Sequence, residues 1–547
     1  MTSLLQSVSI QNFKGFSDEI RVNIRPITLL FGPNSIGKST FIQALQYLLE
    51  ILERGNTNPD RTSLGGLTVD LGGFKNLVHA RDLKREVELE VAIRLGDVSL
   101  PDMTPEAFDD FVDVDPTVFE FYAQLGEIRR KVDSVSVRIA IGWSELRSSA
   151  VVTRYAVNIN GSWFCRIVAS NDGRDARMSI NRENPIFLEP YSEDELEGIA
   201  DLLELDQWAE LEEIAPADVV AHEPEREKSL PRSYSVLPRI LEQVSASGME
   251  KPGAGLRAWL DGFRGALPRL DRMLNIPTPG ASSAQDIYVA REFTRFISAM
   301  VIGPAVLLRE QLQSMRYLGP LRTIPQRQCE PRLSEMASAW ADGTAAWEAL
   351  LRGSQTLVGD CSDWLQLPER LGTGYGVKRR EYREVDVNAD AEDDLGPIRK
   401  RIDLVDEAGF SHQPLDVGVG ISQVLPVVVA ALDESASLVS IEQPELHIHP
   451  AVQVGLGDLF LEGAINRGLS FVIETHSEHL ILRLLRRLRE ADETDGAALR
   501  PEHIGVVCFD RGPLGVRATE ISIGRDGEFD TPWPHGFFDE RGEELFA

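Results

Sequence analysis

Alternating hydrophobic and polar residues near the start of the chain predict short β-strands. Apolar side chains recur among polar neighbours in residues 5–10 and again in residues 20–24. The short apolar run at residues 26–31 then predicts a buried strand. Residues 41–52 carry apolar side chains at helical spacing, so we expect a helix after the glycine-rich turn that follows this strand.

The middle of the chain changes character along its length. Residues 87–95 predict one strand, and residues 132–159 predict two or three antiparallel strands because they are rich in valine and isoleucine. From residue 193 to about residue 316 the spacing is helical, with breaks at proline and glycine. This stretch is therefore expected to be an inserted helical domain. Its heptad pattern is too short for an extended coiled coil.

Strand and helix signals alternate again after residue 317. Residues 438–441 and 470–473 are short apolar runs, each followed by polar residues and then by a helical pattern. Such alternation predicts a parallel sheet with crossover helices. We therefore expect an α/β fold with three parts: an N-terminal part with a β-rich lobe (1–190), an acidic helical insertion (191–316) and a C-terminal part (317–547).

The strongest chemical signal is a phosphate-binding loop. GPNSIGKS, residues 32–39, matches the pattern GxxxxGK[ST] between a predicted strand and a predicted helix. Backbone N–H groups of such a loop bind phosphate oxygens, the lysine reaches the β- and γ-phosphates, and the serine hydroxyl ligates Mg²⁺. The residues expected to bind ATP here are Gly32, Asn34, Ser35, Gly37, Lys38, Ser39 and Thr40, with Ser39 also on the metal.

Polar residues at the ends of two later strands are candidates for the rest of the site. Glu442 ends one predicted buried strand, where an acid faces the crevice that binds nucleotide, so it is the candidate acid for Mg²⁺. His447 and His449 lie close by with two glutamates, which leaves a separate metal site as an alternative. His476 follows the next strand and is a candidate for hydrogen bonding to the γ-phosphate.

A second glycine-containing segment precedes the apolar helix at residue 424. Gly418 and Gly420 allow close backbone approach, and Ser422 lies near the start of the helix. A helix start is an anion-binding feature, so Gly420, Ser422 and Gln423 are expected to contact nucleotide.

In this order the four elements resemble the ATP-binding-cassette (ABC) ATPases of the RecF, SMC and OLD type. The motif IQNFKGF at residues 10–16 looks like the start of the same group. The resemblance implies an ABC-ATPase head that binds ATP and Mg²⁺ and forms a head-to-tail homodimer. In that dimer, Ser422 as the signature serine closes on the γ-phosphate held by the partner. Glu442 is then the Walker B acid, and His476 is the switch histidine.

Further motifs are similar to stand-alone prokaryotic ATPases of anti-phage systems, of the Septu PtuA-like kind. These are EQPELHIHP at 442–450, YLGPLR at 317–322 and WPHGFFD at 533–539. The resemblance covers residues 1–95 and 311–547. It implies a switch that hydrolyses ATP and controls an effector on a separate chain, such as a nuclease. The residues after His476 offer no convincing nuclease motif, so this chain is not expected to be a nuclease itself.

Two departures from the family pattern bear on hydrolysis. Gln443 stands where the family has its catalytic glutamate, and a carboxamide cannot accept a proton as a base. Either Glu445 takes that role, or turnover is slow and ATP acts as a long-lived clamp. The usual glutamine of the Q-loop is also missing, since none lies between Gln46 and Gln124, and His79 is a candidate substitute.

Composition places limits on these functions. A formal charge of −30 argues against a protein whose main task is to coat nucleic acid. The four cysteines are scattered and the start of the chain lacks a signal-peptide pattern, which favours a cytoplasmic protein without a membrane span. The motifs of the RecF and OLD type, the large insertion and the C-terminal extension disfavour the nucleotide subunit of a membrane transporter.

The main alternative is a RecF-like ATPase of DNA repair or chromosome maintenance that clamps duplex DNA. Such a clamp needs a basic face. The candidate arginines and lysines lie in three clusters: Lys378, Arg379, Arg380 and Arg383; Arg399, Lys400 and Arg401; and Arg483, Arg486, Arg487 and Arg489. The acidic residues 193–218 are either a solvated helix face or a docking site for a basic partner.

Overall fold

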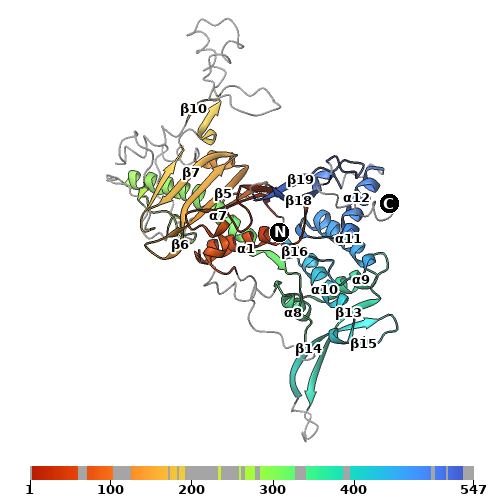
Figure 1. Ribbon diagram of the computed structural model, residues 1–547. Helices are drawn as coiled ribbons and strands as arrows, with labels where there is room; N and C mark the ends of the chain where they lie inside the picture. The colour runs from red at the N-terminus through yellow and green to blue at the C-terminus, as the bar shows by residue number, and fades with distance from the viewer. Residues whose placement is uncertain are drawn as a thin grey trace. The chain divides into compact units, whose positions relative to one another are not determined.

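The computed structural model (Figure 1) describes most of the 547-residue chain. The residues described are 3–58, 71–102, 125–170, 173–181, 184–190, 232–235, 258–259, 265–276, 284–326, 340–385, 395–493, 499–512, 515–531 and 533. The acidic segment at 193–218 and residues 534–539 of the C-terminal motif lie outside this set.

The chain forms two compact units. One comprises residues 1–93, 140–151 and 308–547, and the other comprises residues 94–139 and 152–307. The domain boundaries predicted at 190/191 and 316/317 stay a prediction, because most of the predicted insertion lies outside the described residues.

A mainly parallel six-stranded sheet organises the first unit. Its strand order is β12-β16-β17-β3-β18-β19, and all neighbours are parallel except the last pair. The three central strands are buried on both faces, which explains why each reads as a continuous apolar run. The strands are β12 (Met315–Leu318), β16 (Leu438–Glu442), β17 (Ser470–Glu474), β3 (Ile27–Phe31), β18 (Ile504–Gly512) and β19 (Gly515–Ile521).

Helices follow the strands in the order expected for crossover connections. After β3 comes α1, whose buried face includes Phe41, Leu45 and Leu48 at helical spacing. After β16 comes α11, which starts with Pro450 at its first position and ends at Gly468 with φ of 68°. The helices of this unit are α1 (Lys38–Arg54), α2 (Phe74–Leu77), α8 (Thr344–Arg352), α9 (Gln355–Gln366), α10 (Val419–Leu432), α11 (Pro450–Arg467) and α12 (Glu478–Glu493).

Two antiparallel elements complete the first unit. Strand β1 (Leu5–Gln11) pairs with β2 (Ile20–Asn23) on one side and β4 (Val87–Arg94) on the other. Strands β13 (Tyr375–Val385) and β14 (Leu395–Asp406) form a long hairpin, to which the short β15 (Ser411–His412) is added (Figure 1). Short 3-10 helices lie at His79–Arg81, Pro414–Asp416 and Pro501–His503.

The second unit is built around an antiparallel meander. Strands β6 (Ser149–Ile159), β7 (Ser162–Ala169), β8 (Ala176–Ile180) and β11 (Ala258–Trp259) pair in that order. Strand β9 (Leu188–Pro190) pairs with β10 (Arg232–Ser235), and a 3-10 helix spans Pro185–Phe187. Strands β5 (Ser134–Ser144) and β6 and helix α7 (Ala284–Gln313) each continue across the division between the units.

The predicted α/β fold and its parallel sheet are confirmed. The strands expected at 5–10, 20–24, 26–31, 87–95 and 132–159 and the helix at 41–52 are all present. Two short strands, β10 and β11, lie in the stretch predicted to be helical, because a few residues paired with distant partners leave no periodic signal. No helix among the described residues is long and apolar enough to cross a membrane.

Candidate functional site

The phosphate loop joins β3 to α1 at the carboxyl end of the parallel sheet. Gly32 and Gly37 have φ of 139° and 126°, which other residues rarely adopt. A Cβ at Gly32 would lie 2.4 Å from the Phe509 carbonyl oxygen, and one at Gly37 would lie 2.8 Å from the Phe16 ring. Both glycines are therefore required by geometry, and the loop fits the close approach of a phosphate.

Lys38 is the first residue of α1 and is only 3% exposed. Its ammonium donates hydrogen bonds to the carbonyls of Gly32 (2.8 Å) and Pro33 (3.0 Å) and lies 3.8 Å from Glu474 Oε1. Burial lowers the pKa of Lys38, while the negative charge of Glu474 opposes that shift. The side chain thus runs back along the loop that the sequence assigns to phosphate.

Ser39 contacts the acids at the ends of the neighbouring strands. Its hydroxyl donates to Glu474 Oε2 at 2.6 Å, and it lies close enough to Glu442 to lower the pKa of that carboxyl. Glu442 and Glu474 are the last residues of β16 and β17 and are partners in the parallel register. The structure therefore brings Lys38, Ser39 and Glu442 together as predicted, and it adds Glu474.

Both carboxylates are buried, with exposed fractions of 6% for Glu442 and 5% for Glu474. Burial raises the pKa of each, and the charge of Glu442 raises the pKa of Glu474 further. The hydrogen bond that Tyr317 donates to Glu442 Oε1 at 2.7 Å acts in the opposite direction on the pKa of Glu442. Two carboxylates and a hydroxyl form an oxygen-rich set suited to a hard divalent cation.

The segment after Glu442 turns sharply. Gln443 has φ of 45°, and its N–H donates to the carbonyl of Glu474. Glu445 Oε2 accepts from the Thr475 hydroxyl at 2.8 Å, and its Oε1 accepts from the backbone N–H of His476 at 2.7 Å. Burial raises the pKa of Glu445. Glu445 thus links the loop after β16 to the loop after β17.

His476 lies at the turn between β17 and α12. Burial lowers its pKa, and the positive charge of Lys38 lowers the pKa further. Its Nε2 is buried and has no hydrogen-bond partner among the described residues. A neutral imidazole near Lys38, with one ring nitrogen not used in a hydrogen bond among the described residues, fits the predicted contact with a phosphate.

The signature segment at the start of α10 differs from the expectation for Ser422. Ser422 is fully buried, and its hydroxyl donates to the Pro414 carbonyl at 3.2 Å within its own chain. Gly418 and Val419 are exposed at the helix start instead. Gly420 packs on the loop after Glu442, since a Cβ there would lie 2.7 Å from the His447 carbonyl oxygen.

Two alternatives raised by the sequence gain no support from the geometry. His449 is the N-cap of α11 and accepts a hydrogen bond from the Ala451 N–H, which is a structural role. In the described part of the chain, no group of three histidine, cysteine, aspartate or glutamate side chains is placed to hold a metal. His79 Nδ1 pairs with the Lys14 carbonyl at 2.9 Å, which fixes its ring near the N-terminal strand.

Sequence reasoning missed three residues that complete the site. They are Glu474, Tyr317 and Arg322. In the sequence, Tyr317 and Arg322 stood out only as the ends of the motif YLGPLR at 317–322. Arg322 is 4% exposed, and its guanidinium donates to the Glu442 carbonyl at 2.8 Å. Burial lowers its pKa to about 10, so it stays charged at neutral pH. A polar residue at the end of a buried strand was the signal available for Glu474.

The basic clusters are largely paired with acids. On α12, Arg483 and Arg487 bind Asp458, and Arg486 and Arg487 bind Glu490. On the hairpin, the ion pairs are Arg380 and Arg401 with Asp403, and Lys400 with Glu381. These pairs reduce the positive surface available to a phosphate backbone.

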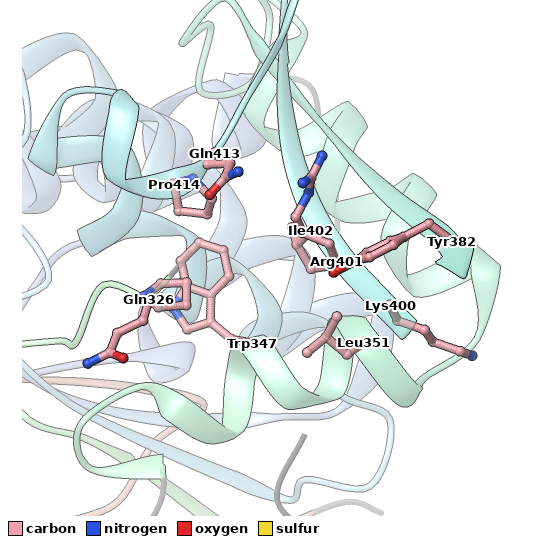
Figure 2. Close-up of a pocket in the computed structure, with 10 residues that line it drawn as sticks. Gln326, Trp347, Leu351, Tyr382, Lys400, Arg401, Ile402, Gln413 and Pro414 are labelled. Carbon is pink, nitrogen blue, oxygen red and sulfur yellow. The ribbon is translucent and has the colours of Figure 1, made fainter. Parts of the chain in front are cut away.

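A pocket lies between the hairpin, α8 and the segment before the signature (Figure 2). Its walls include Trp347, Leu351, Tyr382 and Ile402, and Gln413 and Pro414 close one side. Neither the phosphate loop nor Glu442 or Glu474 lines it, so this pocket is distinct from the candidate nucleotide site.

Two segments of the chain match models of protein families. Residues 4–94 match the family described as "AAA ATPase domain". Residues 353–483 match the one described as "AAA domain, putative AbiEii toxin, Type IV TA system". The first segment contains the phosphate loop, and the second contains the signature segment, Glu442 and His476. Both segments are therefore similar to AAA ATPase domains, and with the sheet order and loop geometry they support the α/β P-loop fold of an ABC-ATPase head.

Solved SMC heads are structurally similar at a distance. The Smc head domain with an extended coiled coil bound to the C-terminal domain of ScpA, from Pyrococcus furiosus, is 11% identical over 95% of this chain and 96% of that chain, with a TM-score of 0.37. The SMC head domain from Thermotoga maritima is 8% identical over 95% and 100%, with a TM-score of 0.34. These scores are too low to add to the fold assignment. No curated protein matches the chain.

Proposed function

We propose that the chain binds and hydrolyses Mg·ATP as an ABC-type switch. In this proposal ATP closes a head-to-tail homodimer, which controls an effector on another chain, a nuclease, in prokaryotic antiviral defence in the cytoplasm. The observation that carries the nucleotide part is the convergence of Lys38, Ser39 and Glu442 at the ends of β3 and β16. The effector part rests on the resemblance to anti-phage ATPases.

Each residue of the loop has a defined task in this proposal. Backbone N–H groups of residues 34–40 hold phosphate oxygens. When ATP binds, the Lys38 ammonium gives up its hydrogen bonds to the carbonyls of Gly32 and Pro33 and donates to phosphate oxygens instead. Ser39 and Glu442 hold Mg²⁺, which neutralises charge on the phosphates when bound. The buried carboxylate and hydroxyl oxygens around Ser39 fit such an ion.

The hydrolytic step depends on the residues after Glu442. The Gln443 carboxamide has no basic site, so it positions water at most. Glu445 is the nearest carboxylate after it in the chain, and burial raises its pKa, which makes it the better proton acceptor of the two. Both its oxygens already accept hydrogen bonds, and these compete with its action as a base. We therefore expect slow turnover.

The dimer part of the proposal is testable at the exposed start of α10. Light scattering should show a monomer without nucleotide and a dimer with ATP and Mg²⁺. Lys38→Ala should stay monomeric because it cannot hold the phosphates. Val419→Arg should bind ATP but stay monomeric, because Val419 is 46% exposed beside the signature. Leu146→Arg, at a residue 78% exposed on the β5–β6 turn, is the matched control and should dimerise.

The effector part needs a separate experiment. The tagged chain is purified from its own cells with ATP and Mg²⁺, and copurifying proteins are identified by mass spectrometry. A stoichiometric nuclease that is lost in Lys38→Ala supports the switch. Copurifying duplex DNA without a protein partner would favour the RecF-like clamp instead, although the ion pairs on α12 and the hairpin argue against that outcome.

A further inference from the structure

Glu474 has no role in the proposed reaction, yet it contacts the side chains of both Lys38 and Ser39 in the phosphate loop. Its Oε2 accepts from the Ser39 hydroxyl at 2.6 Å, and its Oε1 lies 3.8 Å from the Lys38 ammonium. It ends the strand next to Glu442 and is its register partner. A residue with only a packing role would not need an ionisable group at this buried edge.

We propose that Glu474 is a second carboxylate of the metal site, which together with Glu442 and Ser39 sets the affinity for the divalent cation that accompanies the nucleotide. This inference rests on the proposed ATP binding. It goes beyond it by assigning a role to Glu474, which was not among the candidate site residues found from the sequence motifs.

The chemistry of the donor atoms supports this assignment. Ser39 lies near both carboxylates and donates its only hydroxyl proton to Glu474. The lone pairs of its oxygen therefore stay available for a cation. Glu442 and Glu474 lie side by side at the ends of neighbouring parallel strands, and their like charges repel. A divalent cation relieves that repulsion, and carboxylate and hydroxyl oxygens are ligands that Mg²⁺ prefers.

Glu474 should favour nucleotide binding when a divalent cation is present and oppose it when the cation is absent. Glu474 places a negative charge beside Lys38, the residue that must attract phosphate. Removing the charge should therefore help phosphate binding when no metal is present and hinder it when metal is needed. A purely structural role for Glu474 predicts a change in the same direction under both conditions.

The test measures binding of a fluorescent ATP analogue to the full chain in Mg²⁺ titrations and in EDTA. In Glu474→Gln, the Mg²⁺ concentration for half-maximal enhancement of binding should rise about 10-fold. Its affinity for the analogue in EDTA should equal or exceed that of the wild type. Glu474→Asp keeps a carboxylate and should recover part of the Mg²⁺ response.

Glu50→Gln is the matched control, since Glu50 is a buried glutamate of α1 that is 4% exposed, and its Mg²⁺ response should be unchanged. An unaltered Mg²⁺ response in Glu474→Gln would overturn the assignment. So would an equal loss of affinity with and without metal, which would mean that Glu474 only holds Lys38 in place. Failure of the wild-type chain to bind nucleotide under either condition would instead refute the proposed function.

Discussion

Arg322 and Gln423 bind each other through both their side chains and their backbones. The Gln423 side chain accepts from the Arg322 N–H at 3.1 Å and donates to the Arg322 carbonyl at 2.6 Å. The Arg322 guanidinium in turn donates to the carbonyls of Gln423 (3.4 Å) and Glu442 (2.8 Å). This buried pair ties the start of α10 to the end of β16. In the proposed dimer, a movement of α10 would be passed to Glu442 through this pair.

Loss of the Gln423 amide should destabilise the ATPase head. Gln423→Leu leaves the backbone N–H and carbonyl of Arg322 buried without their partner, which costs about 1–3 kcal/mol for each group. The midpoint of thermal unfolding should fall by several degrees. Gln355→Leu is the control, because Gln355 is an exposed glutamine that also accepts from an arginine, Arg379. Equal effects of the two substitutions would show that the Arg322–Gln423 pair has no special role.

Removal of the Tyr317 hydroxyl should shift the pH dependence of ATP hydrolysis. Tyr317 donates to Glu442 and lowers the pKa of that carboxyl, so Tyr317→Phe raises it. Glu442 then becomes protonated at a higher pH. The fall in the rate of hydrolysis on the acidic side therefore begins at a higher pH than in the wild type. Tyr382→Phe, on the exposed hairpin, should leave the profile in place. An acidic limb that does not move in Tyr317→Phe would mean that Glu442 does not control it.

Which residue acts as the catalytic base is tested by removing the carboxylate at Glu445 and, in a separate variant, by introducing one at Gln443. Glu445→Gln should lower the turnover number by about 10²-fold or more if this carboxylate takes the proton. Gln443→Glu should raise turnover, because it restores a carboxylate directly after Glu442. Single-turnover measurements with bound ATP separate these effects from binding. Intact turnover in Glu445→Gln would exclude Glu445 as the base.

His476 should make stability depend on pH on the acidic side of neutrality. Its pKa in the folded chain is lowered, so the unfolded chain takes up a proton first as pH falls below about 6.5. The stability that neutral His476 contributes is complete above that pH and declines toward the lowered folded pKa. Chemical denaturation of the wild type and His476→Gln at several pH values measures this. The difference in their free energies of unfolding should vary below pH 6.5 and stay constant above it.

The sequence predicted those parts of the site that depend on local chain geometry. The glycine-rich loop, Lys38 and Ser39 lie within one strand–turn–helix segment, whose spacing fixes the position of the loop at the end of β3. Glu442 and His476 were found because each follows a short apolar run that forms a buried strand.

The remaining parts depend on contacts between distant segments. Tyr317 and Arg322 reach Glu442 only because β12 pairs with β16, more than a hundred residues away. The hydroxyl of Ser422 bonds to the Pro414 carbonyl through a local turn that the helix-start pattern does not specify. The basic clusters were candidates for a DNA-binding surface in the sequence. Some of their acidic partners are local, such as Glu490 on the same helix, but Asp458 reaches Arg483 from α11 and Asp403 reaches Arg380 from the neighbouring strand.

Equilibrium binding of ATP in the presence of Mg²⁺, measured by titration calorimetry, is the decisive test of nucleotide binding by this loop. The wild-type chain should bind ATP, and Lys38→Ala should lose at least about 10²-fold in affinity, because the phosphates lose a buried cation. Lys400→Ala removes a lysine of the hairpin that is paired with Glu381, and it should bind as the wild type does. Absence of binding by the wild type, or equal binding by Lys38→Ala, would contradict the account.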